Sequence, residues 1–520
     1  MSSEGPSSTA GPSAVEPRRT AGTVGTYLLD RFRIDTRSLA ALRVALGAIL
    51  VVDLLHRAGS IGLFYTDAGV YPVAAYEATY SQFTGLSVHA VSGALWAQAL
   101  LFVCAGAFAL SFLVGYRTRT TGLVSLVLLF SLQARNPAVL NGGDRLLRVL
   151  LAVSLLTPLG ERFSIDALRR GASRRHVRSF GTAALLAQPL VVFGVNAIAK
   201  HRGETWYAGD ALEVAMANDV MTILLGEVIA GYPTLLTAMT YGWVALLAGS
   251  TPLLLLTAGR LRALAVAAYT GAFLGMALSM TVGLFPLALI ASVLPFLPAV
   301  AWRVAARYVP SSWLSARPAT PPGPLASPPI EQRALSWLES RDARAPGYLT
   351  AYCRSLLTVL GALTIVWMLL FAAGNVSAYD VPEGVDYETL DQQRWSLYAP
   401  DPNDGYSWYV TEAELTDGTT VSAVAEGNVS FDRPPDPAAE YETFRHRKHM
   451  QAVRSSAADD PGVIATSYAE WACGRAGEIH GRSAETVTVY RLYQPSPING
   501  TYEQRHLIEI LEHECASSSA

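Results

Sequence analysis

Nine long runs of apolar residues, separated by short polar segments, dominate the chain between residues 38 and 373. A helix of about 20 apolar residues crosses the hydrocarbon core of a bilayer, and most of the runs approach that length. The pattern predicts nine transmembrane helices, over residues 38–56, 88–115, 121–133, 146–159, 182–200, 234–258, 263–281, 284–302 and 355–373.

The arginines between these runs lie at alternate ends of them. Positively charged loops of membrane proteins stay on the cytoplasmic side. We therefore predict a multi-pass protein of the cell membrane, with a cytoplasmic N-terminus and an extracytoplasmic C-terminus. Arginine-rich segments lie at residues 18–33, 117–119, 162–178, 260–262 and 303–353, whereas the loops at 57–87, 134–145 and 201–233 contain few cations.

Two segments lack the apolar pattern. Residues 1–30 begin with a stretch rich in Ser, Gly, Pro and Ala, which predicts a disordered tail. Residues 303–353 are polar and proline-rich, which predicts a cytoplasmic linker. A transmembrane domain is then expected over residues 31–302, and the last transmembrane helix over 354–373.

The region after residue 373 has a different pattern. Alternating runs on either side of Asp417 and Gly418 predict a β-hairpin. Residues 441–455 and 465–474 favour short helices, and the stretches ETVTVYRLY and QRHLIEILEHE favour strands. We therefore expect an α-helical integral membrane bundle with a C-terminal extracytoplasmic α+β domain over residues 374–520. In that compartment Cys473 and Cys515 could form one disulfide, and two unpaired thiols are the alternative.

Composition narrows the classes of function. The chain is 51% hydrophobic and only 16% charged, which is too apolar for an ordinary soluble enzyme. Its net charge of −3 leaves no basic surplus for binding nucleic acid. The sequence has no HExxH or CxxC pattern and no helical pair of histidines, so we predict no metal site.

Lysine is scarce, and this makes Lys200 conspicuous. Of 39 Lys and Arg residues only Lys200 and Lys448 are lysines, and Lys200 ends an apolar helix. A lysine can lose its proton when it is buried and then serve as a base, whereas an arginine stays charged. The alternative is that Lys200 simply extends its ammonium to the lipid headgroups.

The predicted topology places three polar loops on the same face as Lys200. They contribute Asp67, Asn141 and Asp144, and Trp206 follows the lysine, so we expect these residues to form one outward-facing pocket. Each has a simpler interpretation: a turn residue for Asp67, a turn with a helix N-cap for Asn141 and Asp144, and an interfacial aromatic residue for Trp206. In the C-terminal domain, the stretch FRHRKHM at 444–450 predicts a solvated helix face, with metal or anion binding as the alternative.

Four blocks of the sequence together carry a resemblance to a known family. They are IDTRSLAALRVALGAILVVDLLHR, LFYTDAGVYP, RNPAVLNGGDRLLRVLL and VVFGVNAIAKHRGETWYAGDAL. In this order and spacing they resemble the HTTM family, the horizontally transferred transmembrane domain, which is similar to vitamin K-dependent gamma-carboxylase. The stretch LDQQRWSLYAPDP, at 390–402, resembles the block that follows the last helix in prokaryotic members.

The resemblance implies a chemistry and a set of site residues. In the carboxylase a membrane-embedded lysine is thought to deprotonate reduced vitamin K. Oxygen then yields a strong base, which removes a proton from a glutamate side chain, and carbon dioxide adds to the carbanion. By resemblance Lys200 is the catalytic base and Asn141 orients the quinol or the lysine. The quinol-binding residues would be Asp67, Asp144, Arg148 and Trp206.

The implied co-substrates are a reduced quinone of the vitamin K or menaquinone type, oxygen and carbon dioxide. The implied partners are the lipid bilayer and a glutamyl-containing protein on the outer face. The chain departs from the carboxylase in two places. Ala199–Lys200 stands where the carboxylase has a lysine pair, and Asn141–Asp144 offers no histidine.

Two classes of function follow. One is a carboxylase-like enzyme that uses a reduced quinone. The other is a non-enzymatic membrane-anchored binding or scaffold protein that presents its extracytoplasmic domain. A large exposed apolar patch on residues 374–520, without a closed pocket near Lys200, would favour the second. Transport would require polar groups at several depths of the last four apolar runs, and their interiors contain no charged residue.

Overall fold

The computed structural model describes residues 29–79, 85, 87–171, 173–308, 346–375, 398–403, 405–438, 440–458, 462–496 and 502–516. Most of the predicted N-terminal tail and residues 309–345 of the predicted linker lie outside this set, as does the first part of the block at 390–402.

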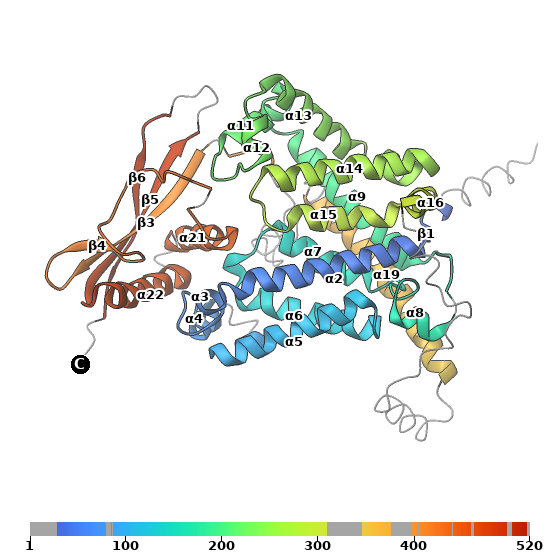
Figure 1. Cartoon of the computed structure of the whole chain (residues 1–520), viewed down its shortest axis with the longest axis horizontal. Helices are drawn as coiled ribbons and strands as arrows, with labels where there is room; N and C mark the ends of the chain where they lie inside the picture. Colours follow the sequence, from blue (N-terminus) through green and yellow to red (C-terminus); the bar gives the residue numbers. More distant parts are fainter. Residues whose placement is uncertain are drawn as a thin grey trace, which may run out of the picture.

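The long helices between residues 36 and 375 form a bundle. Figure 1 shows its long helices running side by side, with the C-terminal sheet at one end, which we call the sheet end. The bundle helices are α2 (Thr36–Ala58), α5 (Leu95–Val114), α6 (Thr118–Arg135), α7 (Gly142–Ser154), α9 (Phe180–Lys200), α13 (Pro233–Ala248), α14 (Gly259–Ser279), α15 (Phe285–Val293) and α19 (Pro346–Asn375).

Shorter elements connect these helices. Asp35, at the start of α2, accepts a hydrogen bond from the backbone N–H of Arg37 and caps the helix. The connecting elements are β1 (Ile34–Asp35), which pairs with β2 (His176–Val177), and α3 (Ile61–Tyr65), α4 (Val73–Thr79), η2 (Val88–Ala90), η3 (Pro137–Val139), α8 (Ile165–Arg170), α10 (Glu204–Ala208), α11 (Ala211–Ala217), α12 (Leu225–Ile229), η4 (Thr251–Leu256), η5 (Leu294–Phe296) and α16 (Ala299–Tyr308).

Five helices of the described residues are long and apolar enough to cross a membrane. They are α2, α5, α9, α14 and residues Ser355–Gly374 of α19. A sixth span would require the pair Phe285–Phe296 and Ala299–Tyr308, which is bent by 110°. The other predicted runs also form helices, α6, α7 and α13. These are not among the helices that are both long and apolar enough to cross a membrane. The prediction of nine transmembrane helices is therefore not confirmed.

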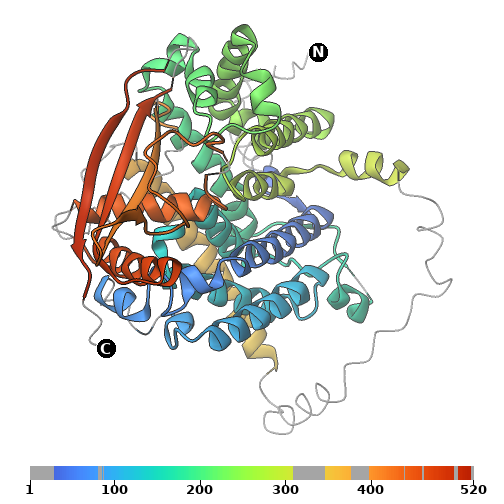
Figure 2. The ribbon, with the colours of Figure 1, turned by 60° about the vertical axis from the view of Figure 1, so that its left-hand side comes forward.

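The C-terminal region is an α+β unit. Its antiparallel sheet has the strand order β4-β3-β5-β6, and the hairpin predicted at Asp417 and Gly418 joins β3 to β4. Two helices lie between this sheet and the bundle, as Figure 2 shows. The strands are β3 (Gly405–Leu415), β4 (Thr420–Ser422), β5 (Ala484–Pro495) and β6 (His506–Glu514), and the helices are α21 (Phe444–Ala457) and α22 (Val463–His480).

Helix α21 corrects one sequence prediction. The stretch 444–450 was expected to be a solvated helix face, but Arg445 and His449 are 3% and 2% exposed. The helix packs against η3 of the bundle, and its ring contacts include one between His449 and Phe64. The basic face is buried because acidic residues of the bundle meet it.

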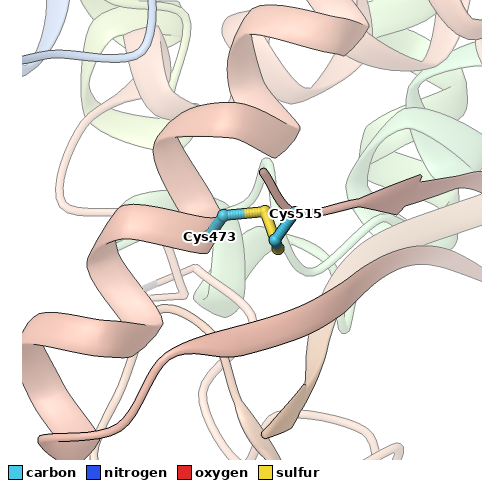
Figure 3. The surroundings of a disulfide bond; sticks show 2 residues. All are labelled: Cys473 and Cys515. Carbon is cyan, nitrogen blue, oxygen red and sulfur yellow. A yellow bond between two sulfur atoms is a disulfide. The ribbon is translucent and has the colours of Figure 1, made fainter. Parts of the chain in front are cut away.

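A disulfide joins Cys473 and Cys515. Cys473 lies on α22 and Cys515 just beyond the end of β6, as Figure 3 shows. The bond links the helix layer to the edge of the sheet, and both of its ends lie within the C-terminal domain.

Candidate functional site

A cavity of about 460 Å³ lies in the bundle at the sheet end. This volume is within the usual range for a small-molecule site. Its walls come from α9, α13, α14 and α15, together with short helices of the 204–229 segment. The lining is almost entirely aliphatic and aromatic, and includes Phe193, Trp243, Phe273 and Met276.

Glycines of α13 and α14 border the cavity. Helix α13 packs on α9, and α14 packs on α15. Three glycines lie in the wall between them, Gly242, Gly271 and Gly275, and an added Cβ at any of them would meet nothing within 4 Å. Gly242 and Gly271 are exposed. These glycines therefore leave open space on α13 and α14 beside the cavity.

Lys200 is the one charged side chain among the described lining residues. It ends α9 and is only 3% exposed, so it does not extend to the surface. Its Nζ lies 3.7 Å from the centre of the Trp206 ring, an arrangement in which the aromatic face attracts a cation.

A segment of the C-terminal region closes the cavity at this point. The carbonyl oxygen of Tyr398 accepts hydrogen bonds from Lys200 Nζ at 2.9 Å and from Trp206 Nε1 at 3.0 Å. Tyr398 itself lines the cavity, and its hydroxyl is buried without a hydrogen-bond partner among the described residues. Burial raises the pKa of Tyr398 to about 12, so this hydroxyl keeps its proton at neutral pH.

Asp401 attaches the same segment to α10. Its carboxylate accepts hydrogen bonds from the Thr205 hydroxyl at 2.5 Å, the Thr205 N–H at 2.9 Å and the Glu204 N–H at 3.2 Å. Burial opposes ionisation, but these hydrogen bonds prevail and hold the pKa of Asp401 below its usual range. The carboxylate is thus ionised, and its hydrogen bonds fix the segment on α10.

Asn141 does not line the cavity. It is the N-cap of α7, and its Oδ1 accepts from the N–H groups of Gly143 and Asp144. Its Nδ2 donates to the carbonyl of Val282 at 3.2 Å. Both the oxygen and the nitrogen of the Asn141 amide have partners within the bundle. Lys200 is not among these partners. The simpler interpretation, an N-cap after a turn, describes what is observed.

Asp144 belongs to a second buried site, which we call the four-charge cluster: Asp53, Arg57, Asp144 and Arg445. Arg57 donates to Asp53 at 2.9 Å and to Asp144 at 2.6 Å. Arg445, from α21, donates to Asp53 at 2.6 Å and to Asp144 at 3.1 Å. All four side chains are at most 4% exposed. The cluster joins the C-terminal domain to the bundle.

The remaining predicted site residues also lie apart from the cavity lining. Asp67 is exposed, and its Oδ1 accepts a hydrogen bond from the Val73 N–H in a turn. Arg148 donates to Gln133 at 3.0 Å and packs over the Phe130 ring. The expected single pocket is therefore divided, and only Lys200 and Trp206 of its predicted members line the cavity.

The family model of the HTTM domain matches residues 32–302, which is more than half of the chain. The chain belongs to the HTTM family. It is accordingly a membrane protein, which agrees with its apolar helices. No curated protein and no solved structure matches the chain.

The matched HTTM domain contains most of the cavity but not all of it. Tyr398 and Asp401 follow the last helix and complete the site from outside the matched residues. Among the described residues, no group of three or more His, Cys, Asp or Glu side chains is placed to hold a metal ion.

Sequence reasoning missed several residues of the site. Tyr398 and Asp401 lie in the block at 390–402, and the resemblance singled out that block without indicating its contact with Lys200. The spacing of Gly271 and Gly275 was a further signal. Such glycine pairs usually allow close helix packing, but here they line the cavity, and an added Cβ at either would meet open space.

Proposed function

We propose that this HTTM protein is a carboxylase-like enzyme that uses a reduced quinone, with Lys200 as its general base. The main support is the position of Lys200. The chain uses arginine nearly everywhere, yet it has a lysine as the charged residue of an apolar, ligand-sized cavity. Arginine could not lose a proton there, whereas lysine can.

The cavity residues fit a reduced quinone. Aromatic and aliphatic side chains suit a ring with an isoprenoid tail, and the open space at the glycines of α13 and α14 would admit a ligand dissolved in lipid. At the sheet end the ligand's hydroxyl groups would meet Lys200, the Trp206 ring and the Tyr398 hydroxyl. These are the polar groups that such a head requires in otherwise apolar surroundings.

Lys200 would act by taking a proton. Apolar surroundings disfavour a charged amine, and the neutral amine is the form that accepts a proton from a hydroxyl. The Tyr398 carbonyl, as a hydrogen-bond acceptor, would orient the amine in either protonation state. A reduced quinone would supply the electrons for oxygen reduction and, from that reaction, the base for carboxylation of a glutamyl side chain. The apolar walls would exclude water from the reactive base.

We further propose that the sheet end faces the outside of the cell. The arginine-rich loops favour this orientation, and the disulfide is typical of an oxidising compartment. A glutamyl-containing protein would then approach from the outer side. The scaffold alternative has less support, because a ligand-sized cavity lies at Lys200.

The test is a quinol epoxidation assay on purified protein in lipid, with reduced menaquinone and oxygen. We expect epoxide from the wild type and none from Lys200→Met, which keeps the length of the side chain and removes the amine. Lys200→Arg should be equally inactive because its charge cannot be removed. Lys448→Met, at the other lysine, is the matched control and should retain activity.

No epoxide from folded wild type, with several quinols and with glutamyl peptides and carbon dioxide present, would contradict the proposal. Equal activity in wild type and Lys200→Met would retain the enzyme but remove Lys200 as its base.

A further inference from the structure

Residues 398–403 fit closely over the end of the cavity where Lys200 lies. Gly203 is buried, and an added Cβ there would lie 2.1 Å from the carbonyl oxygen of Pro400. Only glycine permits this approach. Tyr398 has a φ of 52°, in the left-handed region that bulky residues avoid. Such a conformation persists only where surrounding contacts impose it.

The contacts that impose it come from two places. Asp401 accepts three hydrogen bonds from Thr205 and Glu204, and the Tyr398 carbonyl accepts two from Lys200 and Trp206. The carboxylate and the carbonyl are three residues apart on one segment. Fixing Asp401 on α10 therefore also fixes the carbonyl that holds the lysine.

We propose that Asp401 is a positioning residue for Lys200: by holding residues 398–403 on α10, it keeps the amine on the Tyr398 carbonyl and shields it from water at the sheet end. The consequence for catalysis rests on the proposed function. The shielding itself does not depend on it. Release of Asp401 would expose Lys200 to a water-soluble substrate at the sheet end.

The test measures how fast Lys200 reacts with a water-soluble amine-acylating reagent that does not enter lipid. The background variant is Lys448→Arg in nanodiscs, which leaves Lys200 as the one lysine of the chain. Peptide mass spectrometry then follows acylation of Lys200 over time and across pH. No quinol or turnover is required.

We expect slow acylation in the background and an increase of about tenfold or more in Asp401→Ala, because the local opening that exposes the amine becomes easier. Asp401→Asn keeps one acceptor oxygen and should give an intermediate rate. Thr205→Val removes only the hydroxyl donor and should also be intermediate. Gly203→Ala, which displaces the segment without removing a hydrogen-bonding group, should resemble Asp401→Ala.

The matched control is Asp432→Ala, an exposed aspartate of the same domain whose carboxylate meets Arg505 rather than α10. It should acylate at the background rate. Each variant is first checked for an unchanged thermal midpoint of the C-terminal domain, so that general unfolding is not mistaken for local release.

Background-rate acylation in folded Asp401→Ala and Gly203→Ala would overturn the proposal, as would rapid acylation of Lys200 in the background itself. The two proposals can fail separately. Acylation as expected without epoxidation would retain the positioning role and remove the function, and epoxidation without any effect of Asp401 on acylation would do the reverse.

Discussion

The cavity and the four-charge cluster are both buried charged sites at the sheet end, yet they are built in opposite ways. The cluster holds two arginines and two aspartates within hydrogen-bond distance of one another. The cavity holds one lysine among apolar side chains, and this lysine donates a hydrogen bond to a backbone carbonyl. The cations of the cluster are arginines, which cannot lose a proton, whereas the cation of the cavity is a lysine, which can.

The difference indicates what each site is for. Burying an ion is costly unless an opposite charge and further hydrogen bonds compensate for lost water. The cluster meets that condition, so it suits a permanent joint between Asp53 and Asp144 of the bundle and Arg445 of the C-terminal domain. Beside the amine of Lys200 lie a backbone carbonyl and an aromatic face, and the described lining of the cavity contains no carboxylate, which agrees with the proton exchange that we propose for it.

Breaking the cluster should have the largest effect on stability. Arg445→Met leaves Asp53 and Asp144 with only Arg57, so one buried negative charge is uncompensated. We expect the free energy of unfolding to fall by about 3–5 kcal/mol. Denaturant titration in mixed micelles would measure it. Arg454→Met, on the same helix but with a half-buried side chain, should change it by less than about 0.5 kcal/mol.

A double variant sharpens this prediction. Adding Asp53→Asn to Arg445→Met restores the charge balance, so the pair should cost at least about 1 kcal/mol less than the sum of the two single changes. Strict additivity would show that the two side chains act independently.

The disulfide separates the stability of the C-terminal domain from its joint with the bundle. Cys515→Ser opens a bond between residues 42 apart in sequence, and removal of a native disulfide typically costs about 2–5 kcal/mol. We expect a lower thermal midpoint for the C-terminal domain. Acylation of Lys200 should not change, because neither cysteine belongs to α10 or to residues 398–403. A faster acylation would mean that the disulfide also supports the cavity.

His449, on α21, predicts how the stability of the protein depends on pH, because protonation would place a charge on its buried ring. Its ring is 2% exposed, between Phe64 and Tyr468, and among the described residues neither ring nitrogen has a hydrogen-bond partner. Burial, with a smaller effect of His446, lowers the pKa of His449 to about 3. Between pH 6.5 and 3, the unfolded chain therefore binds a proton that the folded chain does not.

Stability must accordingly fall as pH falls through that range. Between pH 7 and 5 we expect this one residue to account for a loss of about 2 kcal/mol. His449→Leu should reduce the pH dependence by that amount, as measured by denaturant titrations at both pH values. His513→Gln, on β6, is the control. An unchanged slope in His449→Leu would show that the ring is hydrated or already paired.

Replacing Lys200 should have the smallest effect on stability. Lys200→Met removes a buried amine together with its hydrogen bond, and the Tyr398 carbonyl keeps its second donor, Trp206 Nε1. We expect the free energy of unfolding to change by no more than about 1 kcal/mol in either direction. A loss of stability as large as that in Arg445→Met would show that Lys200 holds the fold together as the four-charge cluster does, and would contradict the distinction between the two sites.

Local pattern predicted the helices and strands well. The apolar runs all became helices, because backbone hydrogen bonding and apolar length are local properties of a segment. The alternation around Asp417 and Gly418 likewise gave the hairpin of β3 and β4. The number of spans was predicted less well, because α7 has 13 residues and α13 has 16, although their apolar runs continue beyond them.

The sequence by itself determined that the chain is a membrane protein of the HTTM type. It also showed that Lys200, at the end of an apolar helix, is one of only two lysines among 39 Lys and Arg residues. Tertiary structure decided which groups meet. Lys200 and Tyr398 are 198 residues apart, and Asp53 and Arg445 are 392 apart. Hydropathy and spacing describe a segment, whereas such partners depend on how helices pack in three dimensions. For that reason Asn141 and Asp144 looked like neighbours of Lys200, and the structure places them in a cap and in the joint between domains.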